Sequence, residues 1–110
     1  MLFPAPRFVV LVPSVQATQP PESGVTNRVV HADADGLRVV IFGFATGARL
    51  PAHTAPQRAI VEVVSGELEL TLGDRTHTAR EGTWVYMDAG LVHAVTAARP
   101  AVMRLTLLPA

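Results

Sequence analysis

The chain has 110 residues and a mass of 11.7 kDa, and its nine basic and nine acidic residues give a formal net charge of zero. This balance provides no electrostatic basis for binding nucleic acid or an anionic membrane, and the absence of cysteine excludes disulfide scaffolds, iron–sulfur sites and a thiol nucleophile. With 49% hydrophobic and 16% charged residues, the chain is predicted to form one folded domain over residues 1–110.

The N-terminal region contains one apolar run, from Phe8 to Val12, framed by prolines. The run is too short to span a bilayer, and no cleavage signal follows it. We expect it to be the first strand of a cytoplasmic protein. Residues 14–24 are polar and rich in proline, which predicts a surface loop.

From Val25 onward the sequence is a succession of short apolar runs separated by turn residues, with no helical period. Such spacing is typical of an all-β sandwich or barrel. A long break is expected over residues 47–56. The predicted strands are Val25–His31, Leu37–Phe44, Ile60–Val64, Leu68–Leu72, Thr83–Met87, His93–Thr96 and Val102–Leu108.

The alternation within these runs predicts which faces are buried. In residues 67–72 the leucines fall on one face and the carboxylates on the other, and residues 102–107 send Met103, Leu105 and Leu107 inward. Residues 39–44 are apolar on both faces. Because a strand buried on both sides needs a second covering layer, we expect a homodimer.

Glycine and histidine recur at defined spacings in residues 47–66 and 82–97. The matching positions are Gly47, His53 and Gly66 in the first segment, and Gly82, Gly90 and His93 in the second. The two segments resemble the two sequence motifs of the cupin superfamily of small jelly-roll β-barrels. The resemblance implies a single cupin domain with a barrel core over residues 37–108, preceded by an N-terminal strand and loop over residues 1–36.

The resemblance also identifies candidate metal ligands. In metal-binding cupins, two histidines and a glutamate of the first motif and one histidine of the second hold Fe, Mn, Ni or Zn. This chain keeps His53 and His93, but Ala55 and Ala59 stand in place of the other histidine and the glutamate. Two imidazoles are fewer than the three protein ligands that a catalytic zinc or non-haem iron site ordinarily has.

Two residues are candidates for a third ligand. Gln57 lies in the connection that follows His53, and Glu62 is the one charged residue within its apolar run. Counted from Ala59, the alternation points Val61 inward and Glu62 outward. Glu62 is therefore either a replacement ligand or the partner of an arginine on the outer face.

The remaining pocket residues follow from alternation in the other strands. Trp84 and Tyr86 share one face of their strand, with Val85 and Met87 on the other, and either pair is able to line the barrel. We take the aromatic pair. The predicted ligand pocket comprises Phe42, His53, Gln57, Trp84, Tyr86, His93 and Met103. His31 and His77 lie beside turn residues, and we expect both to be solvated.

Two functional classes remain open, because the cupin fold hosts many activities. The first is a small protein that binds a small molecule in its barrel and whose metal site is incomplete. The second is a metal-dependent enzyme, of oxygenase or isomerase type, that uses His53 and His93 with a non-standard third ligand.

Overall fold

The structure is a computed structural model, and it describes residues 19–110. The predicted first strand, Phe8–Val12, lies outside the described residues. Within residues 19–110 the fold is all-β, as predicted, and no helix crosses or could cross a membrane. The strands are β1 (Val25–Ala32), β2 (Arg38–Phe44), β3 (Arg49–His53), β4 (Ala59–Ser65), β5 (Glu67–Leu72), β6 (Arg75–Arg80), β7 (Trp84–Met87), β8 (His93–Ala97) and β9 (Ala101–Leu107).

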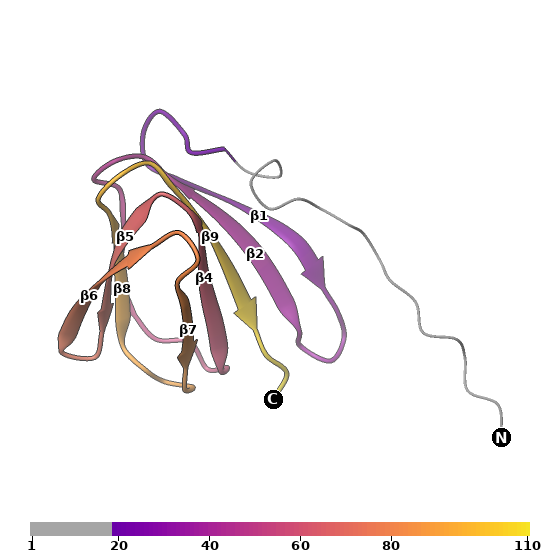
Figure 1. Cartoon of the computed structure of the whole chain (residues 1–110). Coiled ribbons are helices and arrows are strands. Elements are labelled where there is room, and N and C mark those ends of the chain that lie inside the picture. The colour runs from indigo at the N-terminus through magenta and orange to yellow at the C-terminus, as the bar shows by residue number, and fades with distance from the viewer. Residues whose placement is uncertain (1–18) are drawn as a thin grey trace, which may run out of the picture.

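The strands form two antiparallel sheets that face each other as a jelly-roll barrel. One sheet has five strands in the order β1-β2-β9-β4-β7, and the other has four in the order β3-β8-β5-β6. In Figure 1, β5, β6 and β8 stand on one side, and β1 and β2 extend away from them on the other. Strands far apart in sequence, such as β2 and β9, therefore pair directly.

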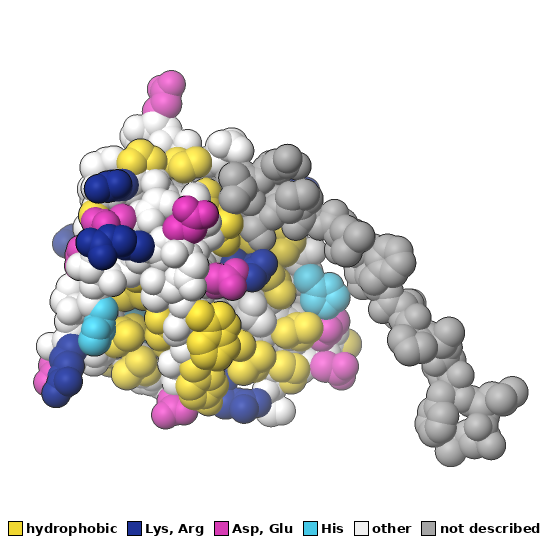
Figure 2. Space-filling view, in the orientation of Figure 1, with side chains coloured by type: hydrophobic (Ala, Val, Ile, Leu, Met, Phe, Trp, Pro, Cys, Tyr) yellow, Lys and Arg dark blue, Asp and Glu magenta, His cyan; other side chains and the backbone are white. Residues whose placement is uncertain are grey.

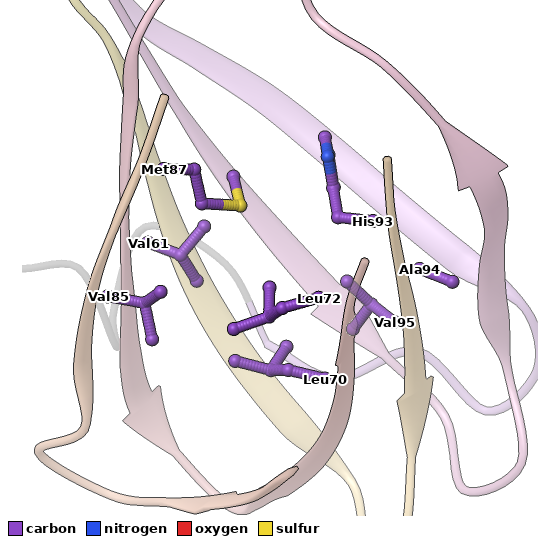
Figure 3. A pocket seen from close by; sticks show the side chains of 8 residues that line it. All are labelled: Val61, Leu70, Leu72, Val85, Met87, His93, Ala94 and Val95. Carbon is purple, nitrogen blue, oxygen red and sulfur yellow. The ribbon is translucent and has the colours of Figure 1, made fainter. Parts of the chain in front are cut away.

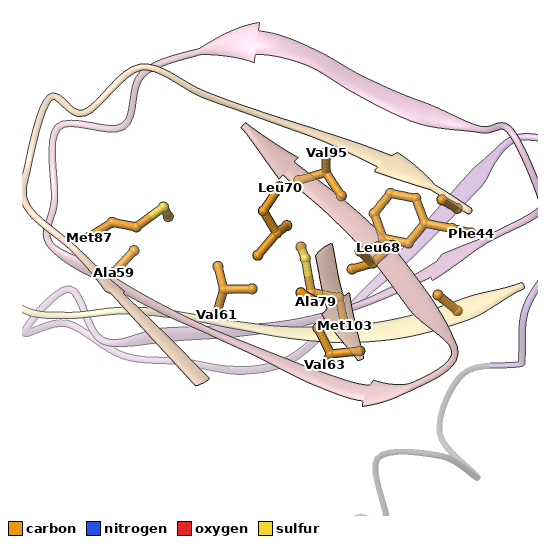
Figure 4. Packing of buried hydrophobic residues seen from close by; sticks show 12 residues of the cluster. Phe44, Ala59, Val61, Val63, Leu68, Leu70, Ala79, Met87, Val95 and Met103 are labelled. Carbon is orange, nitrogen blue, oxygen red and sulfur yellow. The ribbon is translucent and has the colours of Figure 1, made fainter. Parts of the chain in front are cut away.

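The hydrophobic core lies between the sheets (Figure 4) and is built from alternate residues of β4, β5, β8 and β9, with one residue each from β2, β6 and β7. Leu68 and Leu70 on β5 are 0% and 2% exposed, and Val61 and Val63 on β4 are 4% and 1% exposed. These are the inward faces that the alternation predicts. The cluster comprises Phe44, Ala59, Val61, Val63, Leu68, Leu70, Ala79, Met87, Val95, Ala97, Ala101 and Met103.

Two strands were not predicted. The expected break over residues 47–56 is wrong because it contains β3, and the polar segment Arg75–Arg80 forms β6. Both strands are edges of the four-stranded sheet. An edge strand has one side free of ladder hydrogen bonds, so it tolerates Pro51 in β3 and a largely exposed sequence in β6.

Candidate functional site

The two histidines at the motif positions lie directly opposite each other. His53 ends β3 and His93 begins β8, and the two residues are register partners across the antiparallel pair. Directly opposed residues project to the same face of a sheet, and their ring centroids are 4.2 Å apart with the ring planes at 60°. His93 is 9% exposed, whereas His53 is exposed. The imidazole pair therefore connects the barrel interior with solvent.

Hydrogen bonds to the backbone determine the tautomer of both rings. Nδ1 of His53 lies 2.7 Å from the carbonyl oxygen of Pro51, and Nδ1 of His93 lies 2.9 Å from that of Leu91. Because a carbonyl oxygen only accepts, each Nδ1 is the protonated donor. In the neutral rings Nε2 then carries the lone pair, which is able to accept a hydrogen bond or bind a metal.

A small apolar pocket adjoins His93 inside the barrel (Figure 3). It is lined by Val61, Leu70, Leu72, Val85, Met87, His93, Ala94 and Val95. His93 is the one lining residue with a polar side chain, and in Figure 3 it lies on the opposite side of the pocket from Met87. The empty space, counted with open solvent at the mouth, is about 210 Å³. The part of this space that is open to the centre of a water-sized sphere is about 10 Å³, about enough for one water molecule, so a larger molecule enters only if the apolar walls move apart.

The aromatic pair of β7 does not line this pocket, which corrects the choice between the two faces of that strand. Trp84 and Tyr86 are 58% and 44% exposed, whereas Val85 and Met87 take the inward positions. The physical reason is the pairing of β7 with β4, which places Trp84 opposite Glu62. Apolar side chains gather in the lower half of the face shown in Figure 2.

Two other predicted pocket residues belong to the packed core instead. Met103 is 2% exposed within the core cluster, and Phe42 packs against that cluster. The Phe42 ring stacks on Phe44, with centroids 6.2 Å apart. Neither lines the pocket. The leucines that do, Leu70 and Leu72, were visible in the sequence as inward residues of their strand but were not assigned to the site.

The two candidates for a third metal ligand have other partners. The Gln57 amide nitrogen donates to the carbonyl oxygens of Gly36, at 2.8 Å, and Leu108, at 3.0 Å, so it fastens the β3–β4 connection to the β1–β2 turn and the chain end. The Glu62 carboxylate accepts a hydrogen bond from Arg104 on the neighbouring β9. This is the arginine partnership that the alternation favoured.

No group of three or more His, Asp and Glu side chains able to hold a metal ion occurs within residues 19–110. The donor set near the pocket is therefore two imidazoles. It does not fit a metal centre with three or four protein ligands, because the positions of the missing histidine and glutamate are occupied by Ala55 and Ala59.

Asp88 and Gly90 belong to a tight turn in which Gly90 has φ of +83° and the Leu91 amide donates to the Asp88 carbonyl oxygen at 3.3 Å. The ring of His93 is oriented by the Leu91 carbonyl rather than by the Asp88 carboxylate.

Comparisons with known proteins agree with this architecture. The structure is similar to a conserved protein of unknown function from Streptococcus pyogenes, at 24% identity and a TM-score of 0.83, over 94% of this chain and 90% of that one. It is also similar to a cupin superfamily protein from Desulfitobacterium hafniense, at 18% identity and a TM-score of 0.82, over 96% and 94% of the two chains. KdgF from Halomonas sp. matches at 24% identity and a TM-score of 0.70, over 76% and 78% of the two chains.

At these identities the structural likeness shows the fold. No curated protein sequence matches the chain. The family model described as the cupin domain matches residues 40–108, a segment that contains both histidines and every strand that lines the pocket. The chain therefore belongs to the cupin family.

Proposed function

We propose that this protein binds a small, largely apolar molecule inside the barrel and that its imidazole pair holds the polar end of that molecule. The observation that carries the proposal is the pair of Nε2 atoms of His53 and His93, for which residues 19–110 provide no backbone partner, beside a pocket whose other walls are apolar. Apolar walls with a few placed polar groups are typical of small-ligand sites.

The chemistry of the rings favours a ligand that carries a hydroxyl group. A neutral imidazole protonated at Nδ1 accepts at Nε2, so a ligand hydroxyl would donate to it. His93 reaches the buried pocket and His53 reaches solvent, so the polar end of the ligand is expected near the mouth and its apolar body between Leu72 and Met87.

Methionine methyl NMR tests this proposal with benzyl alcohol as the probe. Met87 lines the pocket, whereas Met103 is 2% exposed in the core and does not line it. We expect benzyl alcohol to shift the Met87 methyl resonance in a saturable manner and to leave that of Met103 nearly unchanged. His93→Ala should weaken binding about fivefold, because it removes one hydrogen bond.

His31→Ala is the matched control, because the ring of His31 bonds to Asp33 in the β1–β2 region and does not line the pocket. This variant should bind benzyl alcohol as the wild type does. A Met87 methyl that does not respond to the probe in the wild-type protein would contradict the proposed function.

A metal-dependent enzyme is the second candidate, and the two available Nε2 atoms are the observation that favours it. Such a site would need its further ligands from outside residues 19–110 or from bound molecules. Metal analysis of protein purified without chelator decides between the two. The metal candidate predicts close to one equivalent in the wild type and loss in the His53→Ala, His93→Ala double variant, and less than about a tenth of an equivalent in both overturns it.

The homodimer is also a proposal. Both faces of β2 are already covered within the single chain, where Val40 and Ile41 are 6% and 1% exposed, so the support comes from Trp84 and Tyr86, which present exposed aromatic surface on β7. Aromatic residues are enriched where protein surfaces associate. Sedimentation as an 11.7 kDa monomer at micromolar concentration would contradict it.

A further inference from the structure

Strand β6 places two basic side chains on the interior face of the barrel. Arg75 is the register partner of Leu72 and His77 is the partner of Leu70. Both leucines line the pocket. Since directly opposed residues share a face, Arg75 and His77 project to the same side of the sheet as the pocket lining.

The register places Arg75 level with the imidazole pair. His53 opposes His93, His93 opposes Leu72, and Leu72 opposes Arg75, so one row crosses all four strands of the sheet. Neighbouring strands lie about 4.8 Å apart, so the backbone of Arg75 is about 10 Å from that of His93. A small molecule between them is within reach of both a long guanidinium side chain and an imidazole.

Among the strands that line the pocket, no acidic side chain shares the face of this row. The strands that line the pocket are β4, β5, β7 and β8, and their acidic residues, Glu62, Glu67 and Glu69, alternate to the outer faces. Two of these carboxylates are paired with the outward arginines Arg104 and Arg80.

Arg75 differs from those two arginines, because no salt bridge or side-chain hydrogen bond within residues 19–110 includes it. It is exposed and is not itself a lining residue of the pocket; its connection to the pocket is its register position opposite Leu72. A guanidinium without an ion-pair partner, on the strand next to a pocket-lining residue, is suited to a carboxylate, which it binds through charge-assisted hydrogen bonds.

We propose that Arg75 binds the carboxylate of the pocket's ligand, so that the ligand is a small apolar hydroxy acid. The hydroxyl donates to Nε2 of an imidazole, the carboxylate accepts from Arg75 at the other end of the row, and the apolar body enters the pocket. This inference rests on the proposed function and adds the chemical class of the ligand.

The test compares mandelate with mandelamide, which has nearly the same shape but no charge, by the same Met87 methyl titration. The expected result is binding of mandelate about tenfold tighter than that of mandelamide. Arg75→Gln should remove this difference, whereas Arg75→Lys should retain part of it. Arg80→Gln is the matched control, because Arg80 lies on the same strand but faces outward, where it pairs with Glu67 at 2.9 Å.

The outcomes separate the two proposals. If benzyl alcohol shifts Met87 but mandelate and mandelamide bind equally, or if Arg75→Gln leaves the affinity for mandelate unchanged, the carboxylate inference is overturned and the binding proposal stands. If none of the three compounds shifts Met87, the proposed function fails and the inference fails with it. A loss of mandelate binding in Arg80→Gln equal to that in Arg75→Gln would also overturn the assignment to Arg75.

Discussion

The two ends of the barrel interior follow the same strand alternation but have different packing. At one end Phe44, Val63 and Leu68 are 0%, 1% and 0% exposed, and they lie together at one side of the cluster in Figure 4, with Met87 and Ala59 at the other side. At that other end, which we call the open end, Ala59 and Met87 are buried as well, but the inward row also includes partly buried Leu72 and exposed His53. An inward position in the alternation therefore places a residue in the barrel interior. Whether that residue belongs to the packed core or to the binding site depends on whether neighbouring side chains fill the space beside it.

Gly66→Ala is expected to have the largest effect. Gly66 lies at the end of the barrel interior that Phe44, Val63 and Leu68 fill, which we call the closed end. Gly66 joins β4 to β5 with φ of +80°, and a Cβ there would lie 2.1 Å from the Pro100 carbonyl oxygen and 2.7 Å from the Ala101 Cα. Because both atoms are backbone, the chain must shift, and we expect unfolding to become easier by about 3–5 kcal/mol. Urea denaturation measures the change.

Gly82→Ala is the control for Gly66→Ala. Gly82 has φ of +88°, but a Cβ there would meet nothing within 4 Å. It should cost about 1–2 kcal/mol, from backbone conformation alone. Equal losses in the two variants would show that close packing against residues 100–101 is not what distinguishes the closed end.

Leu68→Ala and Leu72→Ala compare the two ends within one strand. Leu68 is 0% exposed in the core, whereas Leu72 lines the pocket and is partly buried. We expect Leu68→Ala to destabilise by about 2–5 kcal/mol, because it leaves a cavity in packed surroundings. Leu72→Ala should destabilise by less and should alter benzyl alcohol binding, since its neighbours already border open space. The reverse order in denaturation experiments would contradict the comparison.

Most of the core was predictable because the strands that build it carry their pattern locally. The alternation in residues 67–72 and 102–107 requires no knowledge of neighbouring strands, and its predicted inward leucines are inward. β3 and β6 were missed because their sequences, with Pro51 and exposed polar residues such as Thr76, lack the apolar run by which the edge strands β1 and β7 were predicted. β3 forms by pairing with β8, and β6 forms by pairing with β5. The pattern of residues within a single strand does not show such pairing.

The site was less predictable than the core for the same reason. The motif spacing selected His53 and His93, but only the register of β3 with β8 places them opposite each other. The inward face of β7 is set by its pairing with β4, so the choice between Trp84 and Val85 was undetermined in the sequence. Arg75 became a candidate only when β6 was seen to pair with β5.

Gln57→Ala tests whether this residue is structural at the open end. Its amide donates to the carbonyl oxygens of Gly36 and Leu108, which lie far apart in sequence. Removing it leaves two partly buried acceptors without that donor, so we expect a loss of about 1–2 kcal/mol in denaturation experiments. Benzyl alcohol affinity should not change. A substantial loss of affinity without a loss of stability would return Gln57 to the pocket.

The smallest expected effect lies outside both ends, in the β1–β2 turn. The hydrogen bond between His31 and Asp33, at 3.0 Å, lowers the pKa of the Asp33 carboxyl from its ordinary value of 3.8, and backbone amides of Asp35 and Leu37 act in the same direction. A carboxyl whose pKa is lower in the folded state stabilises that state above its ordinary pKa, and this contribution is lost as the pH falls below it.

Asp33→Asn removes the charge but retains an oxygen that is able to accept from the amides of Asp35 and Leu37. The thermal midpoint of this variant should therefore lie slightly below that of the wild type near neutral pH, and the difference should vanish as the pH falls through the acidic range below 3.8. Asp35→Asn, whose carboxylate forms no salt bridge within residues 19–110, should show no such convergence. A difference for Asp33→Asn that persists unchanged to pH values well below the carboxyl pKa would mean that the turn is stabilised by its backbone geometry and not by the His31–Asp33 contact.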